Sequence, residues 1–165
     1  MFDKFGEFDS VEEINRAAAA QKEEGDEEAV VTIALENGLT KEDAEDYMDD
    51  RTDSLATPLQ AAVGKLRVES KDLKLSGVLM DWVNELIDLC INDIAFQHAV
   101  RRKGKDLADF IALTAEKGYE KRCVVDKRIV DRARKIKSIV GSHEFSIGIP
   151  DKKTRKELAK RYYLG

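Results

Sequence analysis

Two cysteines and two histidines are the residues of this 165-residue chain best suited to metal binding or nucleophilic chemistry. They are Cys90, His98, Cys123 and His143, and their separations of 8, 25 and 20 residues match no zinc-finger spacing. No neighbouring motif marks either thiol as activated, and the sequence holds no glycine-rich phosphate loop, Gly-x-Ser-x-Gly elbow or His-Glu-x-x-His pair. We therefore expect no catalytic residues, no bound metal, no cofactor and no enzymatic activity.

A run of carboxylates forms the first candidate site. It comprises Glu42, Asp43, Glu45, Asp46, Asp49, Asp50 and Asp53. On a helix these side chains spread around most of the circumference instead of converging on one point, which disfavours a magnesium site. Two interpretations stay open: a solvated helix face, or a surface that imitates a row of phosphates and binds a basic partner.

A cluster of cations forms the second candidate site. It comprises Lys121, Arg122, Arg128, Arg132, Arg134, Lys135 and Lys137. A helix beginning at Asp126 would carry some of them at i, i+4 and i+7, a cationic stripe suited to the phosphates of DNA or RNA. The alternative is a solvated face partly paired with the acidic residues. A winged-helix-like order of elements also fits, although the 119–125 connection is longer than a helix-turn-helix turn.

The two parts of the sequence carry net charges of opposite sign. Residues 1–100 carry 9 Lys and Arg against 24 Asp and Glu, a net charge of −15, whereas residues 101–165 carry 19 against 9, a net charge of +10. The formal net charge of the whole chain is −5. Either the protein presents two different partner surfaces, or one half neutralises the other within the fold.

The segments that would position these residues have the periodicity of helices. Apolar residues recur at i, i+3, i+4 and i+7, and only two prolines interrupt them. We predict a mostly α fold, a compact multi-helix domain over residues 1–165 with an acidic part (1–100) and a basic part (101–165). The expected helices cover about residues 11–24, 26–36, 58–70 and 75–94, with shorter ones starting after Thr40, Asp93, Asp106, Asp126 and Pro150.

Local signals refine these elements. Ser10 and Glu13 have the spacing of a capping box, and Trp82 and Tyr162 are expected in the core. Residues 145–149 alternate between apolar and polar, which predicts one short extended segment. In the basic helix, the residues expected to face inward are Ile129, Val130, Ala133 and Ile136.

The sequence also predicts the cellular compartment of the protein. No apolar run reaches the roughly 18–20 residues of a membrane span. The acidic start Met1 to Asp9 lacks the basic and apolar regions of a signal peptide, and two cysteines fit a reducing compartment. We expect a cytoplasmic protein without a membrane partner.

Several strings resemble the PcfK-like family across nearly the whole chain. They are MFDKFGEFDSVEEIN, ENGLTKEDAEDYMDD, LATPLQAAVGKLRVESKDLK, the DWV at Asp81 to Val83, the KGK at Lys103 to Lys105, and IGIPDKKTRKELAKRYYLG. The resemblance implies a small protein of conjugative plasmids, integrative elements or phages. This family includes anti-CRISPR proteins that inhibit the single-protein, RNA-guided nuclease of type II-A systems, and it supplies no active site to carry over.

The resemblance implies an RNA-guided CRISPR nuclease as partner. Such a nuclease holds its heteroduplex in a positively charged channel, so we expect the segment Glu42 to Asp53 to contact that channel and to block DNA binding or cleavage. The alternative function is a nucleic-acid-binding accessory factor of plasmid or integrative-element transfer, acting through the basic cluster. A homodimer that pairs acidic faces with basic faces also fits the charge pattern.

Overall fold

The secondary structure is mostly helical, as the periodicity predicts. The computed structural model describes residues 5–165, so the first four residues of the acidic start lie outside the described residues. The helices are α1 (Val11–Glu24), α2 (Glu27–Glu36), α3 (Lys41–Met48), α4 (Pro58–Asp72), α5 (Val78–Asn92), α6 (Ile94–Val100), α7 (Leu107–Glu120), α8 (Lys127–Arg132), α9 (Arg134–Val140) and α10 (Lys152–Leu164). Two short strands, β1 (Cys123–Val124) and β2 (Ser146–Ile147), complete the described elements.

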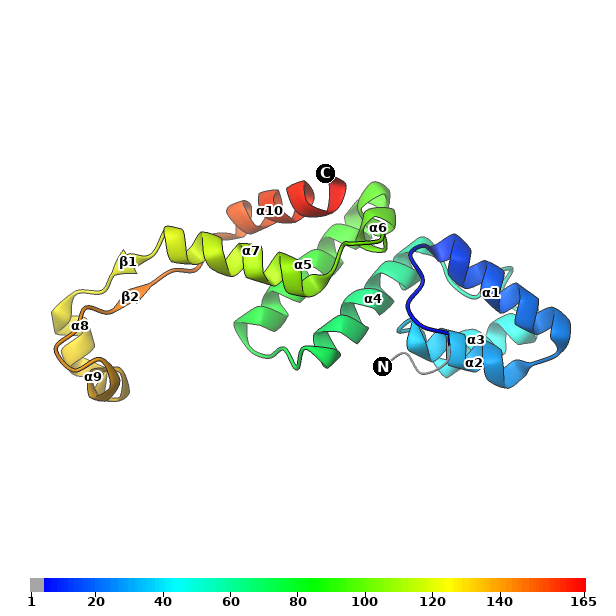
Figure 1. Cartoon of the computed structure of the whole chain (residues 1–165), viewed down its shortest axis with the longest axis horizontal. Helices are drawn as coiled ribbons and strands as arrows, with labels where there is room; N and C mark the ends of the chain where they lie inside the picture. Colours follow the sequence, from blue (N-terminus) through cyan, green and yellow to red (C-terminus); the bar gives the residue numbers. More distant parts are fainter. Residues whose placement is uncertain (1–4) are drawn as a thin grey trace.

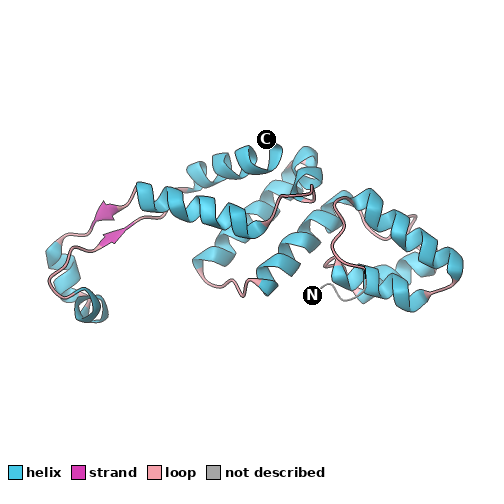
Figure 2. Ribbon diagram, in the orientation of Figure 1, coloured by secondary structure: helices cyan, strands magenta, loops and turns pink. Residues whose placement is uncertain are grey.

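Three parts follow one another along the longest axis of the molecule (Figure 1). The acidic lobe, residues 5–57, holds α1, α2 and α3 at one end. The body, residues 58–120 and 150–165, packs α4, α5, α6, α7 and α10 in the middle. The basic arm, residues 121–149, projects from the body at the other end and carries both strands together with α8 and α9 (Figure 2).

Side-chain caps set most helix starts. Thr40 with Asp43, and Thr57 with Gln60, form reciprocal capping boxes at the starts of α3 and α4. The predicted box at Ser10 forms only in part. The Ser10 hydroxyl accepts from the Glu13 amide, but the Glu13 carboxylate accepts from the amide of Asp9 at 2.9 Å, one residue before the position expected.

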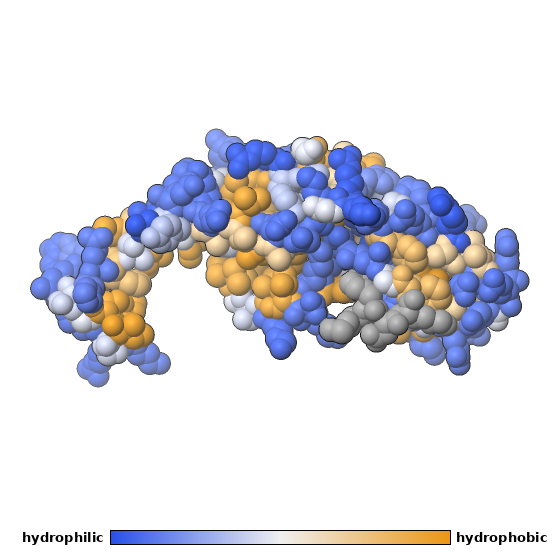
Figure 3. All heavy atoms as spheres, viewed as in Figure 1, coloured by the Kyte–Doolittle hydropathy of each residue, from blue (hydrophilic) through white to orange (hydrophobic). Residues whose placement is uncertain are grey.

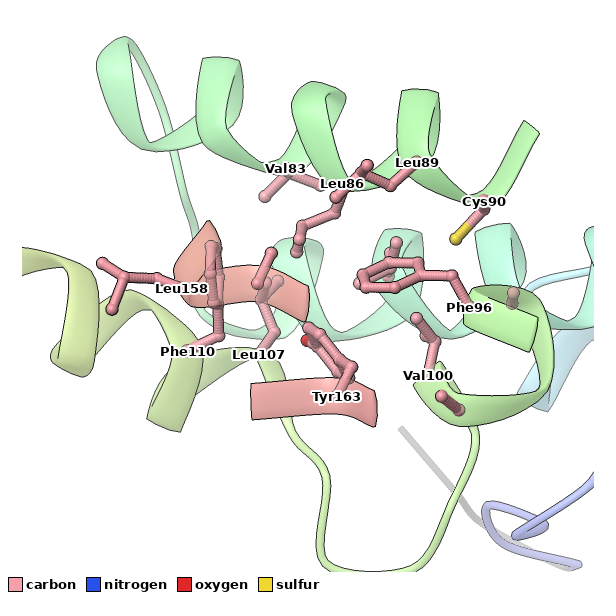
Figure 4. Packing of buried hydrophobic residues seen from close by; sticks show 14 residues of the cluster. Val83, Leu86, Leu89, Cys90, Phe96, Val100, Leu107, Phe110, Leu158 and Tyr163 are labelled. Carbon is pink, nitrogen blue, oxygen red and sulfur yellow. The ribbon is translucent and has the colours of Figure 1, made fainter. Parts of the chain in front are cut away.

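The core of the body surrounds an aromatic cluster (Figure 4). The ring of Tyr163 lies 5.3 Å from Phe96 and 6.0 Å from Phe110, measured between centroids. Trp82 is buried as predicted. The prediction for Tyr162 holds only in part: its side chain is half-buried and packs against this cluster, whereas the adjacent Tyr163 is the fully buried tyrosine.

A second core lies in the acidic lobe, where α1, α2 and α3 pack around Ile14, Ile33 and Tyr47. This cluster reaches Ala61 on α4, which links it to the body. The link is tight, because a Cβ atom on Gly64 of α4 would overlap the carbonyl oxygen of Asn37 at the end of α2. The close backbone approach therefore requires glycine at this position.

A buried arginine crosses the same junction. The Arg101 side chain, whose residue is 2% exposed, donates to the carbonyl oxygens of Phe8 and Ala61 and to Oδ1 of Asn37. Burial lowers the pKa of Arg101, whereas the charges of Glu7 and Glu69 oppose that shift. One side chain thus joins the N-terminal segment, α2 and α4 to the end of α6.

A buried charge cluster lies beside Arg101. Lys65 Nζ lies 2.6 Å from Oε1 of Glu7 and 3.5 Å from Oε1 of Glu69. The two carboxylates share one cation, and Oε2 of Glu69 is buried without a hydrogen-bond partner among residues 5–165. Burial raises the pKa of Glu69 to about 7, so this carboxyl group binds a proton near neutral pH in the folded protein.

The basic arm differs most from the sequence prediction. The extended segment at 145–149 forms β2, but it pairs antiparallel with β1, a strand that the sequence analysis did not predict. The single helix expected from Asp126 is also wrong: it breaks at Ala133, which separates α8 from α9. Of the four residues expected to face inward, only Val130 is buried, and Ile129 is 61% exposed.

The expected helix breaks and its apolar residues stay exposed because the arm lies apart from the body (Figure 1). An amphipathic helix is stabilised mainly by packing its apolar face, and here that face has no neighbouring surface. The base of the arm is held where Gly148 approaches the backbone of Gly118 on α7 so closely that a Cβ atom on either would overlap the other. A winged-helix arrangement, which would pack the basic helix against the preceding one, does not form.

The close approach of Gly64 to the Asn37 carbonyl generates the first prediction. Alanine favours a helix by about 1 kcal/mol over glycine, so Gly64→Ala would stabilise an unobstructed α4. Because the new Cβ atom meets the Asn37 carbonyl, we expect a loss of about 1–3 kcal/mol in the free energy of unfolding, measured by urea denaturation. Arg67→Ala, on the exposed side of the same helix, is the control. A more stable Gly64→Ala variant would contradict the close approach.

Glu69 generates the second prediction. Because its pKa is about 7 in the folded protein and about 4.3 in unfolded chains, only the folded state binds this proton between those values. The free energy of unfolding should therefore rise as pH falls from about 8 to about 5.5, and Glu69→Gln should flatten that rise. Urea denaturation across this range measures it, with exposed Glu116→Gln as control. The same pH slope in Glu69→Gln and the parent protein would exclude Glu69 as its source.

Candidate functional site

The acidic lobe carries the densest charge of the described residues. Residues 5–57 hold 17 Asp and Glu against 4 Lys and Arg, a net charge of −13. Its helices each begin with acidic residues in the first turn, Glu12 and Glu13 in α1 and Glu27 and Glu28 in α2 among them. The predicted segment 42–53 is therefore one part of a larger acidic surface that α1, α2 and α3 build together.

The seven predicted acidic residues differ in the hydrogen bonds and ion pairs that they already make within the protein. Asp43 accepts from Thr40 and Gln60, and Glu45 pairs with Lys41 at 2.8 Å. The remaining local ion pairs join Arg51 to Asp46 and Asp49, and Lys22 to Asp50.

Glu42 and Asp53 make no ion pair within residues 5–165, and both are exposed. A partner meets these two carboxylates without displacing a cation, whereas Asp43, which also has no ion pair among the described residues, is held by hydrogen bonds from Thr40 and Gln60. Their pairs with an external cation would be screened by salt, since exposed charges interact over about 10 Å at 0.1 M.

The basic arm carries the opposite charge. Residues 121–149 hold 8 Lys and Arg against 3 Asp and Glu, a net charge of +5. Arg128 pairs with Asp126 at 2.9 Å and Lys137 with Asp131 at 2.7 Å, while Arg122 covers the ring of Tyr119. The other four cations of the predicted cluster, which make neither an ion pair nor a ring contact with any described residue, are Lys121, Arg132, Arg134 and Lys135.

The helix break changes the expected stripe. Arg128 and Arg132 lie on α8, whereas Lys135 lies on α9 beyond Ala133, so the three no longer follow one helical face. Apolar side chains stand among the cations: Ile129 is 61% exposed and Ile139 is 83% exposed. Figure 3 shows this apolar surface on the arm next to charged surface. A mixed surface of this kind is typical of a binding region.

The two surfaces stay apart. No ion pair within residues 5–165 joins the acidic lobe to the basic arm. Charge pairs between the halves of the sequence form inside the body instead, where Arg155 meets Glu85 at 2.6 Å and Lys160 meets Asp93 at 3.8 Å. Of the two interpretations of the charge pattern, neutralisation within the fold is therefore limited to the body.

The cysteines and histidines do not come together. Within residues 5–165, no group of three or more His, Cys, Asp and Glu residues is arranged to hold a metal ion. Cys90 is buried in the body, where burial raises the pKa of its thiol to about 12, and Cys123 is exposed on β1. In the same part of the chain, no helix has the length and apolar character needed to cross a membrane.

Two features escaped the sequence analysis. The first feature is the polar cluster of Lys65, Glu69 and Arg101. The one sequence signal for it was the presence of charged residues among the apolar positions of the helices. A cavity between α5 and α10 is the other, and the basic face of the last helix beside Trp82 was its signal.

The fold and these surfaces define a helical protein with oppositely charged ends. Compared with known proteins, the chain matches no family model, no curated protein and no solved structure.

Proposed function

We propose that the protein is an anti-CRISPR-like inhibitor, which binds a type II RNA-guided nuclease through the acidic lobe and blocks DNA binding or cleavage. The observation that carries this proposal is the charge of −13 that residues 5–57 gather at one end of the molecule, with no ion pair to the basic arm among residues 5–165. A channel that holds an RNA–DNA heteroduplex is positively charged, and a rigid helical surface of carboxylates is complementary to it. The resemblance to the PcfK-like family supports the choice of partner.

The energetics set a condition on this complex. Exposed ion pairs contribute only about 0–1 kcal/mol each, so several must act together. The lobe provides them on α1, α2 and α3, which its apolar core holds in one arrangement. A complex built this way forms rapidly at low salt and weakens as salt rises.

Binding to a purified type II nuclease, with and without guide RNA, gives the third prediction. We expect a complex at low salt and inhibition of DNA cleavage. Reversing the two exposed carboxylates, Glu42→Lys together with Asp53→Lys, should weaken binding about tenfold, because each change turns an attraction to the cationic channel into a repulsion. Neither change breaks an ion pair among residues 5–165.

The matched control reverses two exposed carboxylates of the body, Asp72→Lys and Glu116→Lys. It changes the net charge by the same amount at a different place. The absence of a complex at low salt would contradict the proposal. Equal weakening by both double variants would show that overall charge, and not the acidic lobe, governs binding.

A second function is supported by the arm. Four exposed cations that make no ion pair with a described residue lie on a projecting segment, together with exposed isoleucines. We propose nucleic-acid binding as an accessory factor of plasmid or integrative-element transfer as the alternative role. Phosphate contacts release counterions, so their number appears in the salt dependence of binding.

A gel shift on duplex DNA and on RNA gives the fourth prediction. The triple change Arg132→Gln, Arg134→Gln and Lys135→Gln should weaken binding and reduce the dependence of log affinity on log salt by about 2–3. The control neutralises three exposed lysines of the body, Lys71, Lys74 and Lys103, and should leave both quantities nearly unchanged. Absence of any shift at about 50 mM salt would count against this role.

A further inference from the structure

A cavity opens between α5 and α10, away from both charged surfaces. Its volume is about 190 Å³, and its apolar lining includes Trp82, Leu86, Leu89, Phe110 and Ala159. All five residues are buried, so the lining is fixed by the core of the body and not by mobile surface side chains. An apolar cavity of about 150 Å³ accommodates a benzene-sized group, so this one has room for a single substituted ring.

Charged side chains surround the cavity unequally. The negative charge of Glu85 is balanced by Arg155, which donates to both carboxylate oxygens, at 2.8 and 2.6 Å. These hydrogen bonds lower the pKa of Glu85. Lys152 and Lys156 are exposed lining residues that make no ion pair within residues 5–165. Among the described residues, Asp88 is the one lining carboxylate without an ion pair, so the two unpaired lysines outnumber it.

The helix that supplies these lysines adds to the positive potential. Lys152 is the first residue of the 13-residue helix α10, and Lys156 follows one turn later. The first turn of α10 contains no acidic side chain, and its cap Asp151 accepts from the Thr154 amide. The N-terminal end of a helix favours anions, which strengthens the bias of the two lysines.

Trp82 is a buried lining residue that carries one polar atom. Its indole Nε1 is buried and has no hydrogen-bond partner among the described residues. A buried donor without an acceptor costs free energy and is uncommon in folded proteins. Because this nitrogen is covered by protein atoms, Trp82 contributes apolar surface to the cavity and no hydrogen-bond donor.

We propose that the cavity between α5 and α10 is a binding site for a small apolar anion. An aromatic or branched aliphatic group fills the apolar cavity, and a carboxylate attached to it lies at the mouth against Lys152 and Lys156. Neither the acidic lobe nor the basic arm takes part, so this site is independent of both proposed functions.

The single tryptophan of the chain gives a local reporter. A nitrogen–proton correlation NMR spectrum contains one indole cross-peak, that of Trp82. We expect para-trifluoromethylbenzoate to shift this cross-peak saturably, with a dissociation constant of about 1 mM or below. The neutral analogue, para-trifluoromethylbenzyl alcohol, should bind at least about fivefold more weakly, because it lacks the charge that the lysines recognise.

Variants then locate the anion. Lys152→Gln together with Lys156→Gln should weaken benzoate binding about fivefold or more and leave the alcohol unaffected. Lys153→Gln, an exposed neighbour outside the cavity lining, is the control and should change neither. These are surface substitutions, so the fold is retained, and the rest of the NMR spectrum verifies it.

Fluorine–proton Overhauser effects from the trifluoromethyl group to Leu86 and Phe110 should place the apolar group inside the cavity. The proposal is overturned by an indole cross-peak that does not shift saturably up to about 10 mM benzoate. Equal affinity for acid and alcohol, or benzoate binding unchanged by the double lysine variant, would likewise overturn it.

Discussion

The buried guanidinium of Arg101 is the interaction on which the arrangement of the acidic lobe and the body depends. Its nitrogens donate to groups from the N-terminal segment, the end of α2 and the start of α4, so one side chain joins three segments that are distant in sequence. A guanidinium has donors in a fixed planar geometry and stays charged when buried, which suits it to this place better than lysine. The glycine contact between α2 and α4 brings these acceptors close enough to share it.

This junction has a consequence for charge. Because the lobe is held at one end of the body and the arm projects from the other, opposite charges end up far apart along the longest axis (Figure 1). An arm folded back onto the acidic lobe would have paired these charges, and paired surface charges add little to stability. Kept apart, they leave a strongly negative and a moderately positive surface, each available to a partner of the opposite sign.

The two surfaces differ in rigidity as well as sign. The acidic lobe has its own apolar core, so its carboxylates sit on helices with fixed positions. The arm has two short strands and two short helices, and Val130 is the one residue of α8 and α9 that is buried. A rigid surface suits recognition of a shaped channel, whereas an arm with exposed isoleucines and cations suits a partner that covers it. The cavity beside Trp82 belongs to neither, because it lies within the packed body.

The sequence by itself determined the helices and the sign of each part. Caps at Thr40, Thr57 and Asp106 and the apolar period are local signals, and local signals suffice for helix starts. Only the tertiary structure decided which tyrosine enters the core, that β1 pairs with β2, that the basic helix breaks, and which carboxylates are already paired. Each of these depends on contacts between residues far apart in the chain, or on the absence of a surface to pack against, and neither leaves a local pattern.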